Sequence, residues 1–212
     1  MQDKQHEIEK KFYWNNTLAK NLLSKKTVRT KTFTDTYYDT ATHQHTTSDQ
    51  WLRNRGGIWQ LKIPSSLNAD AQVYQEIDDL QEIAAHLQLP AINKQTLEEA
   101  GIHPFITLHN TRHTYTHKEL TICLDTVQNN STYLRIGEIE KIVHTPSQSK
   151  QAEEEIRSYA QQQNIRLLAH EPKKVGVFLK EQHPTHYQRL IQTRVFNQNA
   201  YQTNPLTKAD NY

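Results

Sequence analysis

The sequence is poor in the residues that build cross-links, tight backbone loops and membrane spans. It contains one cysteine, Cys123, which excludes an internal disulfide and a zinc site made of several thiolates. Its five glycines are scattered, and no Gly-x-x-x-x-Gly-Lys loop is present. No apolar run approaches the length of a membrane span, and the start, MQDKQHEIEKK, lacks the apolar stretch of a signal peptide. We therefore expect a soluble, cytoplasmic protein with no membrane partner.

The charges are too evenly balanced to indicate a partner by themselves. Lys and Arg number 25 against 23 Asp and Glu, and this formal net charge of +2 argues neither for nor against nucleic acid. The partner that we expect is a small molecule and not a nucleic acid. The histidines His43, His45, His113 and His117 stand in polar surroundings, and we expect them to be solvated rather than bound to metal. The chain is long enough for one sizeable core, and we expect a monomeric single domain over residues 1–194. Residues 195–212 are polar and predict a flexible tail.

Alternation of polar and apolar residues predicts most of the secondary structure. Strands are expected at residues 5–14, 27–38, 50–63 (two runs around Gly56-Gly57), 72–78, 105–116, 118–126 and 132–144. Helices are expected around residues 18–23 and at 79–88, 94–100, 147–163, 172–181 and 184–193, and residues 65–71 read as a loop. Long alternating strands with hairpins favour an antiparallel sheet over parallel βαβ units. The fold class is α+β, with a sheet curled into a barrel of charged interior and helices on its apolar outside.

Acidic side chains recur at every second residue in two of these strands. Glu7 and Glu9 share one strand face with Lys11, and Glu138 and Glu140 repeat the acidic pair far along the chain. Asp125 lies at the end of another strand, on the face opposite its apolar neighbours. Carboxylates that stay ionised side by side need a counter-charge, which a hard cation such as Mg²⁺ supplies. The alternative is a solvated acidic edge, which each pair taken alone favours.

Basic side chains gather in the predicted hairpin. Arg53 and Arg55 share a strand face with Trp51, and Lys62 lies beside Gln60 on the basic side of the returning strand. Two neighbouring arginines repel each other unless an anion bridges them, and the guanidinium fork suits phosphate oxygens. The hairpin therefore predicts a phosphate-binding surface built from side chains.

These motifs together resemble the CYTH superfamily, the triphosphate tunnel metalloenzymes, and are most similar to its thiamine triphosphatases. The resemblance runs from about residue 5 to 193 and rests on Glu7-x-Glu9-x-Lys11, Asp35-Thr36-Tyr37-Tyr38-Asp39-Thr40, Trp51-Leu52-Arg53-Asn54-Arg55, Leu61-Lys62, Gly137-Glu138-Ile139-Glu140 and Tyr187-Gln188-Arg189-Leu190. It implies an eight-stranded antiparallel barrel that forms a charged tunnel for a small-molecule triphosphate.

The resemblance also assigns roles to individual residues. The bases implied to hold the triphosphate are Lys11, Arg53, Arg55, Lys62, Arg112 and Lys174, of which Lys11, Arg53 and Arg55 are the implied catalytic residues. The acids implied to bind Mg²⁺ or Mn²⁺ are Glu7, Glu9, Asp125, Glu138 and Glu140, and Glu76 would line the tunnel. Lys173 is a rival for the role of Lys174. Trp51 either stacks on the thiamine rings or belongs to the core.

One position departs from the family pattern and leaves the function open to alternatives. Cys123 stands two residues before Asp125, where thiamine triphosphatases often carry an acid, and a thiol is a poor ligand for Mg²⁺. The number of metal sites is therefore open. The function implied is Mg²⁺-dependent hydrolysis of thiamine triphosphate to the diphosphate and phosphate. The alternatives are an inorganic tripolyphosphatase, an adenylate cyclase of the same fold, and a non-catalytic polyphosphate- or nucleotide-binding module.

Overall fold

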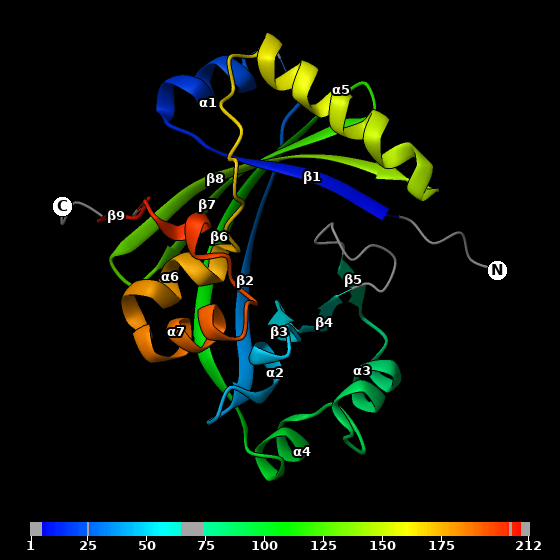
Figure 1. Cartoon of the computed structure of the whole chain (residues 1–212), viewed down its shortest axis with the longest axis vertical. Coiled ribbons are helices and arrows are strands. Elements are labelled where there is room, and N and C mark those ends of the chain that lie inside the picture. The colour runs from blue at the N-terminus through cyan, green and yellow to red at the C-terminus, as the bar shows by residue number, and fades with distance from the viewer. Residues whose placement is uncertain (1–5, 25, 65–73, 204, 209–212) are drawn as a thin grey trace. The chain divides into compact units, whose positions relative to one another are not determined.

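The computed structural model describes residues 6–24, 26–64, 74–203 and 205–208, which belong to two compact units. Unit 1 comprises Met1–Thr32, Asn110–Val177 and Asn199–Tyr212, and unit 2 comprises Phe33–His109 and Phe178–Gln198. The long strands β2 and β6 contribute residues to both (Figure 1).

The elements form one antiparallel sheet with flanking helices. The strands are β1 (His6–Tyr13), β2 (Arg29–Thr40), β3 (Trp51–Arg55), β4 (Ile58–Pro64), β5 (Tyr74–Ile77), β6 (Ile102–His117), β7 (Leu120–Asn129), β8 (Thr132–Val143) and β9 (Thr207–Lys208). The helices are α1 (Asn16–Leu23), α2 (Gln44–Thr47), α3 (Leu80–Leu87), α4 (Lys94–Glu99), α5 (Ser149–Gln162), α6 (Lys174–Gln182) and α7 (Pro184–Gln192), with 3-10 turns η1 (Pro146–Gln148) and η2 (Gln198–Tyr201). The hydrogen-bonded order is β1-β8-β7-β6-β2-β3-β4-β5, with β9 added to β8. This arrangement confirms the predicted α+β class and its eight-stranded antiparallel sheet.

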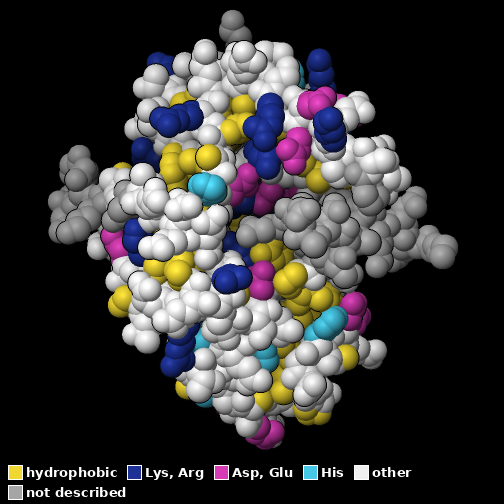
Figure 2. Space-filling model, viewed as in Figure 1, with side chains coloured by type: hydrophobic (Ala, Val, Ile, Leu, Met, Phe, Trp, Pro, Cys, Tyr) yellow, Lys and Arg dark blue, Asp and Glu magenta, His cyan; other side chains and the backbone are white. Residues whose placement is uncertain are grey.

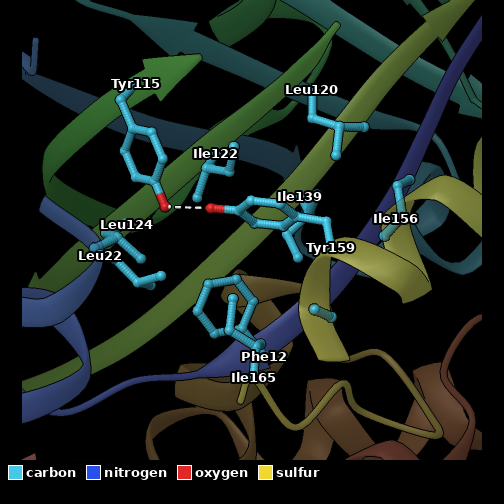
Figure 3. Packing of buried hydrophobic residues seen from close by; sticks show 11 residues of the cluster. Phe12, Leu22, Tyr115, Leu120, Ile122, Leu124, Ile139, Ile156, Tyr159 and Ile165 are labelled. Carbon is cyan, nitrogen blue, oxygen red and sulfur yellow. Dashed lines mark hydrogen bonds between the residues drawn. The ribbon is translucent and has the colours of Figure 1, made fainter. Parts of the chain in front are cut away.

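In unit 1 the apolar faces of β1, β7 and β8 pack beneath α1 and α5 (Figures 1 and 3). Phe12 of β1, Ile122 of β7 and Ile139 of β8 are fully buried there together with Ile156 of α5. Side chains alternate along a strand, so burying Phe12 on this face turns Lys11 to the other. The core therefore fixes which side of the sheet carries the charges.

The register of β1 against β8 follows from one close approach. Phe12 lies opposite Gly137, where an added Cβ would come within 2.6 Å of ring atom Cε1. Only glycine leaves room for the ring at this point. The same register places Lys11 opposite Glu138 and Glu9 opposite Glu140.

In unit 2 the β3–β4 hairpin turns at Gly56 and Gly57, both of which have positive φ. Leu52 and Leu61 of these strands are buried beneath Ile83 of α3. Helix α3 begins after Asp79, whose carboxylate accepts the N–H of Glu82 at 2.8 Å. A strand pair and a capped helix thus close the core of this unit.

The loop expected at residues 65–71 lies outside the described residues. The tail expected from residue 195 differs from the structure, because Phe196 and Tyr201 are buried and residues Thr207–Lys208 pair with β8. Within the described segments, no helix has the length and apolar character needed to cross a membrane.

Candidate active site

Charged side chains cover the face of unit 1 that lies opposite the core. They come from five elements: Lys11 from β1, Arg112 from β6, Asp125 from β7, Glu138 from β8 and Lys174 from the first turn of α6. Asp125 and Glu138 are 1% and 6% exposed. Burying charges is costly unless they are paired, so these groups must hold one another in place. Acidic and basic side chains lie next to each other on the face drawn in Figure 2.

Arg112 and Lys174 both bind the same two carboxylates. Arg112 donates from Nε and Nη2 to the two oxygens of Asp125 at 2.7 and 2.8 Å, and from Nη2 to Glu138 at 3.1 Å. Lys174 Nζ bonds Asp125 and lies 3.1 Å from Glu138 Oε2. Burial opposes ionisation of Glu138, but Lys174, Lys11 and Arg112 together hold its pKa well below its usual value. Both carboxylates are therefore the counter-ions of a cation cluster.

Lys11 is the third cation of this cluster. Its Nζ pairs with Glu9, lies 3.7 Å from Glu138 Oε1 and lies 3.8 Å from Glu171 Oε2. Burial lowers the pKa of Lys11, but these three acids outweigh burial and raise it above its ordinary value. Lys11 is thus a fixed, buried positive charge at neutral pH.

Three of the five predicted metal ligands form a group of their own. Glu7 and Glu9 of β1 and Glu140 of β8 each offer a carboxylate oxygen, and these oxygens lie within 4.8 Å of one another. Burial, followed by repulsion from Glu138 and Glu7, raises the pKa of Glu140 to about 8. Three clustered carboxylates are the hard oxygen donors that Mg²⁺ or Mn²⁺ prefers, so these residues fit a divalent cation. Asp125 and Glu138, by contrast, are turned toward the basic side chains.

The structure adds Glu171, which the sequence analysis missed. Its carboxylate lies 3.5 Å from Lys10 Nζ and 3.8 Å from Lys11 Nζ. The segment that carries it is fixed against β1, because Leu168 N–H donates to the carbonyl of Lys11 at 2.8 Å. Glu171 lies in a loop, where side chains do not alternate between two faces, so the sequence gives no sign of which way its side chain points.

The structure shows different contacts for Lys174 and for its rival Lys173. Lys174 reaches the buried acids through its side chain, whereas the backbone N–H of Lys173 donates to Tyr201 Oη at 3.0 Å.

Cys123, opposite Glu138 in the register, is buried, and its Sγ lies 3.7 Å from Thr114 Oγ1. Burial and the nearby Glu140 raise the pKa of Cys123 to about 12, so it is a neutral thiol at this site.

The basic hairpin of unit 2 is a second cluster with its own acids. Arg55 donates from Nε and Nη2 to the two oxygens of Asp35 at 2.6 and 2.8 Å. Arg53 donates to Gln60 at 3.0 Å and to Glu76 at 3.0 Å. Lys62 Nζ lies 4.9 Å from the ring centroid of Tyr74. The predicted bases of this hairpin are thus brought together with Glu76, and the structure adds Asp35 as a partner.

Trp51 lies in the core of unit 2 rather than on a free surface. It is 4% exposed, and its ring stacks on Phe196 at 5.7 Å between centroids and meets Tyr37 edge-on at 6.4 Å. Its indole N–H donates to Asp49 at 2.7 Å. This burial favours the alternative of a core tryptophan over that of a residue stacking on substrate.

A match to a family model shows which protein family the chain belongs to. The CYTH domain model matches residues 5–172. The chain belongs to the CYTH domain family. Members of this family act on triphosphates and depend on a metal ion. The matched residues include the three clustered acids and the cations Lys11 and Arg112, whereas Lys174 lies just beyond them.

Solved structures share the fold of this CYTH protein at low sequence identity. A Pyrococcus horikoshii protein matches with a TM-score of 0.60 and 18% identity over 83% of this chain and 99% of its own. A candidate adenylyl cyclase from Hippeastrum, described as having a dominant triphosphatase activity, matches with a TM-score of 0.56 and 18% identity over 84% and 96%. A candidate adenylate cyclase from Vibrio parahaemolyticus matches with a TM-score of 0.52 and 19% identity over 76% and 90%.

Proposed function

We propose that this CYTH protein hydrolyses the terminal phosphoryl group of a small-molecule triphosphate with a divalent metal, Mg²⁺ or Mn²⁺. One observation carries the proposal. Three buried or partly buried cations, Lys11, Arg112 and Lys174, converge on two carboxylates directly beside the acids Glu9 and Glu140. A triphosphate carries several negative charges at neutral pH and needs both cations and a metal ion to be bound here.

Lys11, Arg112 and Lys174 can donate hydrogen bonds to phosphate oxygens in place of the carboxylate oxygens that they now contact. Arg112 already presents its planar fork to two oxygens of Asp125, and a phosphoryl group offers the same pair. Lys11 and Lys174 supply compact charges at the two oxygens of Glu138. Bound at Glu7, Glu9 and Glu140, the metal would polarise phosphoryl oxygens and neutralise charge.

A carboxylate of the cluster can then take a proton. When the cations turn to phosphate, Glu138 loses part of its counter-charge and becomes a better base. The oxygen of a water molecule attacks the terminal phosphorus in line, the anhydride P–O bond breaks, and the diphosphate end leaves with the bonding electrons. The proton of the attacking water passes to the carboxylate of Glu138.

The substrate that we propose is thiamine triphosphate, and the support is the motif resemblance of the sequence. Inorganic tripolyphosphate is the alternative, and the burial of Trp51 favours it because that ring offers no open face for thiamine. The names of two structural neighbours make ATP a third substrate worth assaying. We also propose that Arg53, Arg55 and Lys62 bind phosphate, and that the protein is a cytoplasmic monomer.

Two adjacent lysines provide a sharp test of the proposed site. We expect Lys174→Gln to lower phosphate release from the best substrate by roughly 10- to 100-fold, because it removes a charge-assisted contact worth about 1.5–3 kcal/mol. Lys173→Gln is the matched control and should keep most of the activity. Phosphate release is measured from thiamine triphosphate, tripolyphosphate and ATP, each with Mg²⁺ and with EDTA. Equal activity of the two variants, or full activity in EDTA, contradicts the proposal.

A further inference from the structure

A second group of potential metal ligands lies in unit 2, apart from the residues discussed so far. Asp39 is the last residue but one of β2, His43 lies in the turn that follows this strand, and His186 comes from α7. One ligand atom from each of the three lies within 4.8 Å of the others. Asp39 and His186 are both 2% exposed, and His43 is partly buried. The Nδ1 atom of His43 is itself buried, so His43 is not the fully solvated histidine that the sequence predicts.

Two ring nitrogens in this group lack hydrogen-bond partners. The Nδ1 atoms of His43 and His186 are both buried and unpartnered. Buried polar atoms are nearly always satisfied, so two orphaned nitrogens side by side require an explanation. A bound cation is one, because an unprotonated imidazole nitrogen is a metal ligand.

The other nitrogen of His186 is already oriented in the way that metal-binding histidines are. His186 Nε2 lies 2.7 Å from Thr46 Oγ1, and Thr46 is fully buried. If Nε2 carries the ring proton and donates it to Thr46, Nδ1 has an open lone pair. Metal-bound histidines usually donate their second ring N–H to such an outer partner.

Asp39 supplies the negative charge. Its Oδ1 accepts the N–H groups of Thr40 and His45 at 2.7 and 3.0 Å, and its Oδ2 accepts only that of Thr46 at 2.8 Å. Oδ2 therefore keeps a lone pair that can bind a cation. Among the described residues, Asp39 forms no ion pair with lysine or arginine, and its hydrogen bonds come from three backbone N–H groups.

We propose that Asp39, His43 and His186 bind a divalent transition-metal ion of the Zn²⁺ class. Two imidazoles and one carboxylate suit Zn²⁺ or Co²⁺, whereas Mg²⁺ prefers oxygen ligands such as the glutamates of unit 1. The imidazoles stack face to face, with centroids 3.7 Å apart and planes 3° from parallel. Ligand lone pairs lie in the ring plane, so binding turns at least one ring out of this stack. The ion then fastens α7 to the turn after β2, a link that Arg189 already makes to the carbonyl of Thr42 at 3.0 Å.

The test is a titration of the full chain with Co²⁺ and Zn²⁺ in the presence of excess Mg²⁺, which occupies the glutamates. We expect one equivalent of Co²⁺ to bind saturably and give visible d–d absorption, and Zn²⁺ to displace it. His43→Asn should weaken Co²⁺ binding by roughly tenfold or more, the loss caused even by changes to the outer partners of a metal ligand. Asparagine is chosen because residue 43 has φ of +60° and asparagine tolerates this conformation.

Three further variants keep the result interpretable. His86→Asn on α3 removes a histidine outside the group and should leave Co²⁺ binding unchanged. His186→Gln should abolish binding, and if it fails to fold, as judged by circular dichroism, His43→Asn decides alone. The proposal is overturned if the wild type shows no saturable binding of either ion. It is equally overturned if His43→Asn binds Co²⁺ like the wild type, or if the bound equivalent disappears in Glu9→Gln instead.

Discussion

At the scale of single residues, the partners of each arginine decide what its removal costs. Arg55 binds Asp35 through two hydrogen bonds, and the side chain of Asp35 is only 5% exposed. Arg53 binds Glu76, whose side chain is 41% exposed. Removing Arg55 takes two charge-assisted hydrogen bonds from a buried carboxylate, whereas removing Arg53 leaves an acid that water can solvate.

We therefore expect Arg55→Ala to lower the free energy of unfolding by about 1.5–3 kcal/mol, and Arg53→Ala by less than about 1 kcal/mol. Urea unfolding of both variants measures the difference. Adding Asp35→Asn to Arg55→Ala should recover part of the loss, because a neutral amide is less costly to bury than a carboxylate that has lost the Arg55 charge. Both single variants should bind tripolyphosphate more weakly, and unchanged binding would show that the hairpin does not contact phosphate.

Sequence reasoning reached the residues that sit on regular strands and missed those that do not. The two-residue period placed Glu7, Glu9 and Lys11 on one face, and the structure brings these side chains together. Glu171 was not predicted, because a loop has no two-residue period of side-chain direction. The surroundings of Trp51 could not be predicted either, since Phe196, which covers its ring, comes from a segment read as tail.

At the scale of elements, the pairing of β1 with β8 depends on the contact between Phe12 and Gly137. An alanine Cβ at residue 137 would collide with ring atoms of Phe12. We expect Gly137→Ala to lower the free energy of unfolding by about 1–3 kcal/mol, the usual cost of overpacking a core. Combining it with Phe12→Leu should cost less than the sum of the two single changes. Strict additivity in urea unfolding would show that the collision is relieved elsewhere.

The contact of α5 with β6 includes a buried pair of phenols. Tyr115 and Tyr159 are joined by a hydrogen bond of 2.8 Å between their hydroxyls (Figure 3). Burial, and then the bond to Tyr159, raises the pKa of Tyr115, and burial also raises that of Tyr159. The folded protein thus keeps protons that the unfolded chain releases in alkali, so stability is full below about pH 10 and falls above it.

We expect the double variant Tyr115→Phe, Tyr159→Phe to lose less stability than the wild type as the pH rises above about 10. Unfolding in urea across this range measures the slope of stability with pH. Tyr38→Phe, which removes a phenol outside the pair, is the control and should retain the wild-type slope. Parallel slopes for the double variant and the wild type would exclude the pair as the alkali-sensitive element.

At the scale of the whole molecule, we expect a bound metal ion to raise the stability of the folded protein. Glu7, Glu9 and Glu140 repel one another until a cation joins them. A ligand that binds only the folded state at about 100 times its Kd stabilises by about 2.7 kcal/mol. We expect Mg²⁺ to raise the melting temperature in a concentration-dependent way and EDTA to reverse this rise.

Glu9→Gln should lose both this stabilisation and most of the turnover at limiting Mg²⁺, while its fold stays intact because one repelling charge is gone. Glu154→Gln on the exposed face of α5 is the control and should behave like the wild type. Wild-type turnover in Glu9→Gln at limiting Mg²⁺ would show that the metal lies elsewhere.

The position of β1 in the sheet bears on how the chain is made. Strand β1 occupies residues 6–13 and pairs with residues 136–143 of β8, so it leaves the ribosome long before its neighbour exists. Pairing across such a separation is slow, and an unpaired strand that carries Ile8 and Phe12 invites aggregation in the meantime. Between these apolar residues stand Glu9, Lys10 and Lys11. Charges that serve a binding site in the finished protein thus act earlier as gatekeepers of the nascent chain.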